Sequence, residues 1–146
     1  MFPGYRRVRR RRTIIKYYPI NEELAHRANE MNSFFSYVPG RATQSYRAEV
    51  DEAAALAERQ KQRVDPMYHE KIDSLLDTYA RKLAENTNRR NEIAARVPSI
   101  LIAGGSKFTV SKKENQNQAD AAAMKEWQQI QGLLDKIRGT GRGGIS

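Results

Sequence analysis

The chain has 146 residues, of which 39% are hydrophobic and 29% are charged, and its formal net charge is +9. This size and composition predict one soluble domain with a hydrophobic core. The absence of cysteine excludes a disulfide scaffold, a thiolate zinc site and a cysteine nucleophile. No apolar run is long enough to cross a bilayer and no secretory signal is evident, so we expect a cytoplasmic protein without membrane contact.

The first 16 residues carry most of the positive charge. They hold seven basic side chains and no acidic one, which leaves a net charge of +2 for all the other residues. This charge density, without apolar periodicity, predicts a disordered arm over residues 1–16 that contacts DNA or RNA phosphates. A solubilising tail, or an artefact of where translation starts, is the alternative. The candidate phosphate-binding residues are Arg6, Arg7, Arg9, Arg10, Arg11, Arg12 and Lys16.

A helical domain is expected over residues 17–138. Leading into it, the β-branched and aromatic segment from Thr13 to Tyr18 is stopped by Pro19. We expect this segment either to form an edge strand or to lie extended over the helices. Asn21 is a good N-cap for a first helix. The apolar face of that helix is formed by Leu24, Ala28, Met31 and Phe35.

Three aromatic residues lie around the end of this first helix, before a turn at Pro39 and Gly40. Aromatic side chains are usually buried, so we expect Phe34, Phe35 and Tyr37 to pack against the long helix described next. An exposed docking patch is the alternative.

Two long helices are predicted next. The helix over residues 43–64 has a narrow, alanine-rich apolar stripe, which allows close approach of a neighbouring helix. The long central helix spans residues 65–97, because Asp65 is a good N-cap, Pro66 fits the first turn and Pro98 marks the exit. Their short connection predicts an antiparallel helical hairpin.

The apolar stripe of the long helix is interrupted. Asn86 and Arg90 occupy positions on the apolar face between Leu83 and Ile93, where burial without partners is costly. Either the far end of the helix projects beyond the bundle, or a partner meets the helix there. Asn86 and Arg90 are therefore the candidate partner-binding residues.

The only sheet-like sequence follows Pro98. Two short runs, Ile100–Ala103 and Lys107–Val110, flank two glycines and a serine, which predicts a small β-hairpin over residues 100–110. These glycines do not form a phosphate-binding loop, because the spacing of that motif and its terminal Gly-Lys-Ser/Thr are absent.

The last helix is predicted over residues 119–138, with Trp127 on a wide apolar face, and residues 139–146 are predicted to be a flexible glycine-rich tail. The preceding polar segment is expected to be a loop, because lysines are unfavourable at the positive end of a helix dipole. A small anion-binding cluster and a solvated loop are both compatible with its basic residues, Lys107, Lys112 and Lys113.

No catalytic constellation is evident in the sequence. His26 and His69 lie far apart, and neither has the spacing of a metal-binding pair. His69 with Asp65 or Glu70 has the residue types of a base and its orienting group, but a histidine near a helix N-terminus is usually a surface residue. We therefore expect a non-enzymatic protein with no metal or other cofactor.

Several short phrases resemble a known domain. They are Tyr17-Tyr18-Pro19-Ile20-Asn21-Glu22-Glu23, Pro66-Met67-Tyr68-His69-Glu70-Lys71, Asp77-Thr78-Tyr79-Ala80, and the stretch from Val97-Pro98-Ser99 through Phe108-Thr109-Val110 and Lys112-Lys113 to Gln116-Asn117. Over residues 17–146 the chain resembles an uncharacterised domain of accessory proteins from conjugative elements and phages of Gram-positive gut bacteria. The resemblance implies a role in DNA transfer, regulation or suppression of host defence.

These observations predict a non-enzymatic binding protein of a mobile genetic element. The specific hypothesis is an anti-CRISPR-type protein that docks on a nucleic-acid-guided nuclease, such as a Cas nuclease, and blocks DNA loading or cleavage. A first alternative is a basic DNA- or RNA-binding accessory factor for transfer or regulation, although no helix-turn-helix with a basic recognition helix is evident. A second alternative is a structural interaction module or homodimer.

Overall fold

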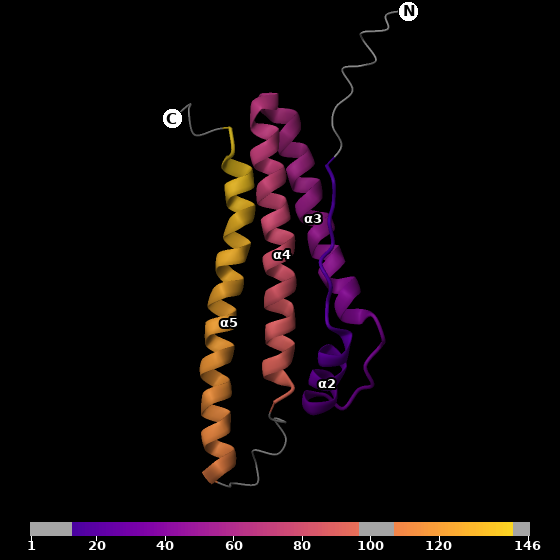
Figure 1. Cartoon of the computed structure of the whole chain (residues 1–146), viewed down its shortest axis with the longest axis vertical. Helices are drawn as coiled ribbons and strands as arrows, with labels where there is room; N and C mark the ends of the chain where they lie inside the picture. The colour runs from indigo at the N-terminus through magenta and orange to yellow at the C-terminus, as the bar shows by residue number, and fades with distance from the viewer. Residues whose placement is uncertain (1–12, 97–106, 142–146) are drawn as a thin grey trace, which may run out of the picture.

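The computed structural model describes residues 13–96 and 107–141 (Figure 1). These ranges contain no β-strand and four α-helices, which are α2 (Glu22–Asn32), α3 (Arg41–Arg63), α4 (His69–Ala94) and α5 (Lys107–Gly139). A short 3-10 helix, η1 (Pro66–Tyr68), precedes α4. The long helices α3, α4 and α5 run side by side in alternating directions, and α2 packs near the end where α4 finishes. The prediction of a mainly α-helical domain with about four helices is confirmed.

Helix α4 forms the centre of the core, because it packs against each of the other three helices. Its predicted position is correct, but the α-helix is shorter than the expected span of residues 65–97. It is preceded by η1, where the Asp65 side chain accepts a hydrogen bond from the Met67 amide at 3.0 Å, and it ends at Ala94. Its buried apolar residues recur at helical spacing and are Ile72, Leu76, Tyr79, Ala80, Leu83, Ala84 and Ile93.

Helix α3 meets α4 through small side chains. Ala53, Ala54 and Ala57 are buried, and small residues of this kind let two helices approach closely, as the sequence predicts. Tyr46 is also buried, and its hydroxyl donates a hydrogen bond to the Ala80 carbonyl oxygen of α4 at 2.7 Å. The polar end of this core tyrosine is therefore satisfied inside the protein.

Helix α3 takes its N-terminal cap from α2. The residue before α3 is Gly40, which has a φ of 84° and no side chain to cap the helix. Instead, the Glu22 carboxylate accepts hydrogen bonds from the backbone amides of Gly40 at 3.0 Å and Thr43 at 2.8 Å, and from the Tyr37 hydroxyl. A carboxylate here satisfies free amides and favours the positive end of the helix dipole. The helix consequently begins at Arg41, before the predicted start at residue 43.

Replacing Glu22 with glutamine is expected to lower the free energy of unfolding by about 1–3 kcal/mol, because an amide donor would face the donors that the carboxylate now satisfies. Burial alone would raise the pKa of Glu22, but hydrogen bonds from Thr43, Tyr37 and Gly40 outweigh it, and the net pKa lies below the usual value. The carboxylate therefore stabilises the fold fully above the usual carboxyl pKa, and this contribution disappears as the pH falls through the lowered value.

Urea unfolding from neutral to acidic pH measures both effects of Glu22→Gln. The variant should lack the part of the pH dependence that Glu22 supplies. The matched control is Glu23→Gln, because Glu23 is exposed and pairs only with Arg27 on the same helix. Equal unfolding midpoints for the two variants at neutral pH would contradict the proposed cap.

Two predictions for the region after α4 are corrected by the structure. Residues 107–110, predicted as the second hairpin strand, form the first turn of α5, which begins at Lys107 and not near residue 119. Residues 100–103, predicted as the first strand, lie outside the described residues. The lysines do not prevent the helix, because the dipole costs at most about 1 kcal/mol within the first turn. The Lys, Glu, Gln and Ala residues that follow are strong helix formers.

The aromatic residues after α2 are placed differently from the favoured prediction. Helix α2 ends at Asn32, so Phe35 does not lie on its face, and both Phe34 and Phe35 are exposed. Tyr37 is half-buried, and its ring stacks on His26 with ring centres 5.5 Å apart. The exposed alternative is therefore correct for the two phenylalanines.

The predicted flexible tail over residues 139–146 starts too early. Gly139 is the last residue of α5, and Thr140 is buried with its carbonyl oxygen accepting a hydrogen bond from Gln60 of α3 at 2.9 Å. The C-terminal end of α5 is therefore fixed to the end of α3. Residues 142–146 lie outside the described residues, as do residues 1–12 of the predicted arm.

Candidate nucleic-acid interface

Residues 13–20 form an extended segment that we call the strap. It runs along α3 in Figure 1 and contains no strand, so the second of the two predicted conformations, an extended chain over the helices, is confirmed. Hydrogen bonds attach the strap to α3 at its start, to both α3 and α4 in its middle, and to α4 at its end. Because it directly follows the arginine-rich residues, these attachments determine where the predicted arm leaves the helices.

The start of the strap is bound to the C-terminal part of α3. The Thr13 hydroxyl donates to a Glu58 carboxylate oxygen and accepts a hydrogen bond from Lys61 Nζ at 3.1 Å. The Lys61 side chain is only 3% exposed, and its ammonium group also forms an ion pair with Asp73 of α4. A buried ammonium group requires such partners. Thr13 is therefore held close to the turn that joins α3 and α4.

Two tyrosines attach the middle of the strap to the two helices. The Tyr17 hydroxyl donates to Asp51 of α3, and the Tyr18 hydroxyl donates to Asp77 of α4 at 2.6 Å. These hydrogen bonds to carboxylates raise the pKa of both tyrosines. The Tyr18 amide also donates to the hydroxyl of Tyr46 at 3.1 Å. The middle of the strap is thus bound to both α3 and α4.

The end of the strap is held by a single side chain of α4. Asn88 Oδ1 accepts a hydrogen bond from the Asn21 amide at 2.7 Å, and Asn88 Nδ2 donates to the Pro19 carbonyl oxygen at 3.1 Å. An asparagine that uses both its donor and its acceptor fixes the direction of the backbone that it contacts. The strap is therefore positioned at both ends.

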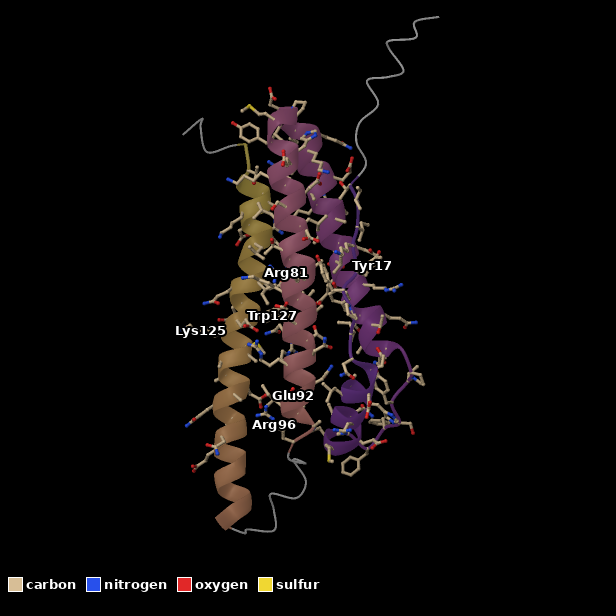
Figure 2. The ribbon with its side chains drawn as sticks, in the orientation of Figure 1. Tyr17, Arg81, Glu92, Arg96, Lys125 and Trp127 are labelled. Carbon is tan, nitrogen blue, oxygen red and sulfur yellow. The ribbon has the colours of Figure 1, made fainter. Side chains whose placement is uncertain are left out.

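Two cations lie against the tyrosine rings of the strap. Lys16 Nζ lies 5.0 Å from the centre of the Tyr18 ring, and the Arg47 guanidinium carbon lies 4.7 Å from the centre of the Tyr17 ring. Both cations are exposed. Tyr17 lies on the side of the molecule away from α5 (Figure 2). Sequence reasoning missed Arg47, because nothing in its position on a mixed-charge helix points to a ring earlier in the chain.

The predicted basic residues are distributed over different parts of the chain. Lys16 lies on the strap, whereas the predicted arginines, Arg6 to Arg12, lie outside the described residues. Lys107, Lys112 and Lys113 belong to the N-terminal part of α5, and their side chains lie outside the described part of the structure.

The start of the strap and the start of α5 lie at opposite ends of the molecule. The bond from Gln60 to Thr140 places the C-terminal end of α5 beside the end of α3, where Thr13 is held. Helix α5 has 33 residues, which corresponds to about 50 Å at 1.5 Å per residue. Lys107 therefore begins α5 at the far end of the long axis from Thr13 (Figure 1).

The two predicted partner-binding residues have different surroundings. Asn86 is 0% exposed, and its Nδ2 donates to the Ala123 carbonyl oxygen at 2.9 Å and to Glu126 at 3.0 Å, both in α5. The partner that meets Asn86 is therefore α5 of the same chain, which corrects the prediction of an external contact. Arg90 is exposed on α4. Burial raises the pKa of Glu49, and the positive charge of Arg90 lowers this pKa in part. Arg90 remains a candidate contact.

The histidines and acidic residues of the described ranges do not form a metal site. No three histidine, aspartate or glutamate side chains within residues 13–96 and 107–141 are placed to hold a metal ion. His26 pairs with Glu30 at 2.9 Å, and His69 Nε2 lies 2.8 Å from the Lys61 carbonyl oxygen. Both histidines thus contribute local structural contacts. Separately, none of the helices that the structure describes has an apolar stretch sufficient to span a membrane.

Comparison with known proteins gives no relative from which a function can be transferred. No protein-family model, no curated protein and no solved structure matches this chain. Function is therefore inferred from the strap, the distribution of charge and the exposed surfaces of the helices.

Proposed function

We propose that this chain is a non-enzymatic binding protein of a mobile genetic element, which acts as an anti-defence inhibitor of the anti-CRISPR type. It docks on a nucleic-acid-guided nuclease in the cytoplasm of a bacterial host and blocks DNA loading or cleavage. The strap supports this proposal because it ties a strongly basic segment to the helices. The resemblance of residues 17–146 to accessory proteins of mobile elements supplies the biological context.

The attachment of the strap is the observation that carries the proposal. Fixing the backbone of one residue costs about 1–2 kcal/mol of conformational entropy, so ordering the whole strap costs on the order of 10 kcal/mol. The hydrogen bonds of Thr13, Tyr17, Tyr18 and Asn88 help to offset this cost. A solubilising tail needs no such attachment. If the helices dock on a nuclease and the basic segment binds its nucleic acid, the segment must start from a fixed position. Such preorganisation lowers the entropy cost of binding.

In the proposed mechanism, the arm and the helices have separate roles. The arginines of the arm contact phosphates of the guide or target nucleic acid, because guanidinium groups bind phosphate through paired hydrogen bonds. Lys16 and Arg47 extend the positive charge along the strap. Exposed helix residues, Arg90 among them, contact the nuclease. The arm thereby occupies phosphates that the nuclease must hold in its own basic channel.

Removing residues 1–12 is expected to abolish inhibition of a guided nuclease. The full chain should inhibit DNA cleavage by at least one member of a panel of purified guided nucleases. Six phosphate contacts imply that inhibition weakens about 10³-fold between about 50 and 200 mM salt. The matched control replaces the six arginines of the arm with lysine, which keeps the charge but removes the paired hydrogen bonds, so inhibition should weaken without being abolished. Undiminished cleavage by every nuclease in the panel would overturn the proposal.

A second candidate function is direct binding of DNA or RNA for transfer or regulation of the element. The cation–ring pairs on the strap favour it, because proteins that bind single strands combine positive charge with exposed aromatic rings. This function predicts that the isolated protein retards labelled DNA or RNA in a gel without any protein partner. A pull-down from host lysate, with and without nuclease treatment, separates the two candidates: only the inhibitor retains its protein target after the nucleic acid is removed.

A further inference from the structure

The loop between α2 and α3 exposes three large apolar side chains, which we call the Phe34 patch. Phe34 is 91% exposed, Phe35 is 82% exposed and Val38 is 58% exposed. Contiguous apolar surface is uncommon on monomeric proteins beyond a few hundred Å² and usually marks a site of interaction. The strap and the core make no use of these side chains.

The Phe34 patch is fixed in its exposed position. Asn29 Nδ2 donates to the Phe35 carbonyl oxygen at 2.7 Å, and the Phe35 amide donates to Ser33 Oγ at 3.1 Å. On the other side of the loop, the Tyr37 hydroxyl donates to Glu22, the same carboxylate that caps α3. The loop is therefore bound to α2 on both sides of the phenylalanines. A preorganised apolar surface loses little entropy when a partner covers it.

An open hollow lies beside the patch. It has a volume of about 850 Å³ and is formed by α2, the beginning of α3 and the end of α4. Phe35 and Tyr37 belong to its wall, and Arg41 is the one charged residue among the lining residues in the described part of the chain. The rest of the lining is uncharged and includes three asparagines, Asn29, Asn32 and Asn91. Its small residues are Ala25, Ala28, Ser33, Ala42, Ser45 and Ala94.

We propose that this surface is the interface of a two-fold dimer, in which the hollow of each copy receives the Phe34 patch of the other. In a two-fold interface the same surface is used on both subunits, so it must be complementary to itself. A projecting apolar patch next to a hollow of small residues meets this requirement. Each copy supplies one projection and one hollow, so the assembly closes at two copies.

The area of the surface is that of a weak, reversible dimer. A phenylalanine side chain buries roughly 150–250 Å², so the three residues of the patch offer about 400 Å² at the observed exposures. The two patches of the dimer together therefore remove about 800 Å² from water, and the walls of the two hollows add to this area. The sum lies at the low end for specific protein interfaces and fits a dimer that dissociates on dilution.

The charges around this surface also permit two copies to meet. Although the whole chain has a net charge of +9, α2 carries three glutamates and one arginine. Glu30 is paired with His26 and Glu23 is paired with Arg27, and Arg41 adds one positive charge at the hollow. Two such surfaces meet without the repulsion that two arginine-rich segments would cause.

The dimer has a consequence that rests on the proposed function. The Phe34 patch lies near α2, whereas Thr13 lies near the turn between α3 and α4, at the other end of the long axis (Figure 1). A dimer joined through α2 therefore leaves the start of each strap outside the interface. A bivalent protein of this form gains avidity for a polyanion long enough to contact both arms.

Sedimentation velocity of the full chain over a range of concentrations tests the dimer. At tens of micromolar we expect a two-copy species that dissociates on dilution. The variant Phe34→Ser/Val38→Ser changes the patch without changing a lining residue of the hollow and should sediment as a monomer. The matched control is Met67→Ser, which removes a 75% exposed apolar side chain from the opposite end and should leave the dimer intact. Circular dichroism and the melting temperature show that each variant is folded.

A second variant tests the hollow itself. Ser45→Trp fills the hollow and should also give a monomer, although the Phe34 patch is unchanged. Mixing it with Phe34→Ser/Val38→Ser, whose hollow is unchanged, restores one of the two contacts and should give a weak heterodimer. A wild-type monomer at every concentration, or a dimer that survives both variants, would overturn the proposal. Nucleic acid is absent from these measurements, so their outcome is independent of the inhibition assay.

Discussion

Replacing Gly141 with alanine is expected to lower the free energy of unfolding by about 2–5 kcal/mol. Gly141 has a φ of +85°, which costs an L-residue about 1–2 kcal/mol. A Cβ atom at this position would lie 2.6 Å from Cγ1 of Val64 and 2.9 Å from its Cβ, so the backbone would have to shift. Overpacking of this kind adds about 1–3 kcal/mol. Urea unfolding followed by circular dichroism measures the loss.

Gly132 provides the matched control for this prediction. It lies inside α5, its φ is not positive, and no atom lies within 4 Å of a Cβ built on it. Gly132→Ala should therefore raise the free energy of unfolding by up to about 1 kcal/mol, the difference in helix propensity between the two residues. If both substitutions changed stability in the same direction, the tight contact at Gly141 would not be the cause.

Replacing Lys61 with methionine is expected to lower the free energy of unfolding by about 2–4 kcal/mol, because it leaves Asp73 without its ion-pair partner. The Asp73 side chain is 32% exposed, so water replaces part of the lost interaction and the cost stays below that of a fully buried pair. The substitution also removes the donor to Thr13. Hydrogen exchange of the strap amides should therefore become faster.

A double-mutant cycle separates the ion pair from the packing of the lysine stem. Asp73→Asn alone should destabilise the protein, and the double variant Lys61→Met/Asp73→Asn should lose clearly less stability than the sum of the two single variants. Thermal or urea unfolding of the four proteins gives the coupling free energy. Strict additivity would show that the two charges do not interact in solution.

Local sequence signals are sufficient to predict the parts of the fold that depend on neighbouring residues. Asn21 caps α2 by accepting a hydrogen bond from the Leu24 amide, as the sequence predicts. Asp65 is also an N-cap, but of η1 and not of the long α-helix. The apolar spacing around Leu76 and Leu83 correctly places the core face of α4. These signals lie within one or two helical turns of the residues that they organise.

The features that the sequence does not predict depend on contacts between distant residues. The start of α3 is set by Glu22 of α2, and the residues next to Gly40 give no sequence signal for this cap. Asn86 interrupts an apolar stripe and therefore looks like an external binding site, but its Nδ2 donates hydrogen bonds to α5 of the same chain. The alanine, glutamine and lysine residues of α5 extend that helix through a segment that turn and charge signals assign to a hairpin and a loop.

The residues of the candidate site also divide into those that the sequence identifies and those that only the structure identifies. Lys16 and the preceding arginines are recognisable from charge alone, whereas Glu58, Lys61 and Asn88 look like ordinary surface residues of long helices. Only the structure shows that these three residues form hydrogen bonds with the strap. A search for basic residues thus identifies the charged segment but not the side chains that fix its position.

The attachment of the strap also determines when, during synthesis, the N-terminal segment acquires its place. The Pro19 carbonyl oxygen is held by Asn88, which lies 69 residues further along the chain. Because translation adds residues from the N-terminus, this bond forms only after most of α4 has left the ribosome. The bonds of Thr13 and Tyr17 to α3 require the chain only as far as Lys61, so they can form earlier. Completion of α4 is therefore the step that fixes the end of the strap, whereas its start depends on α3.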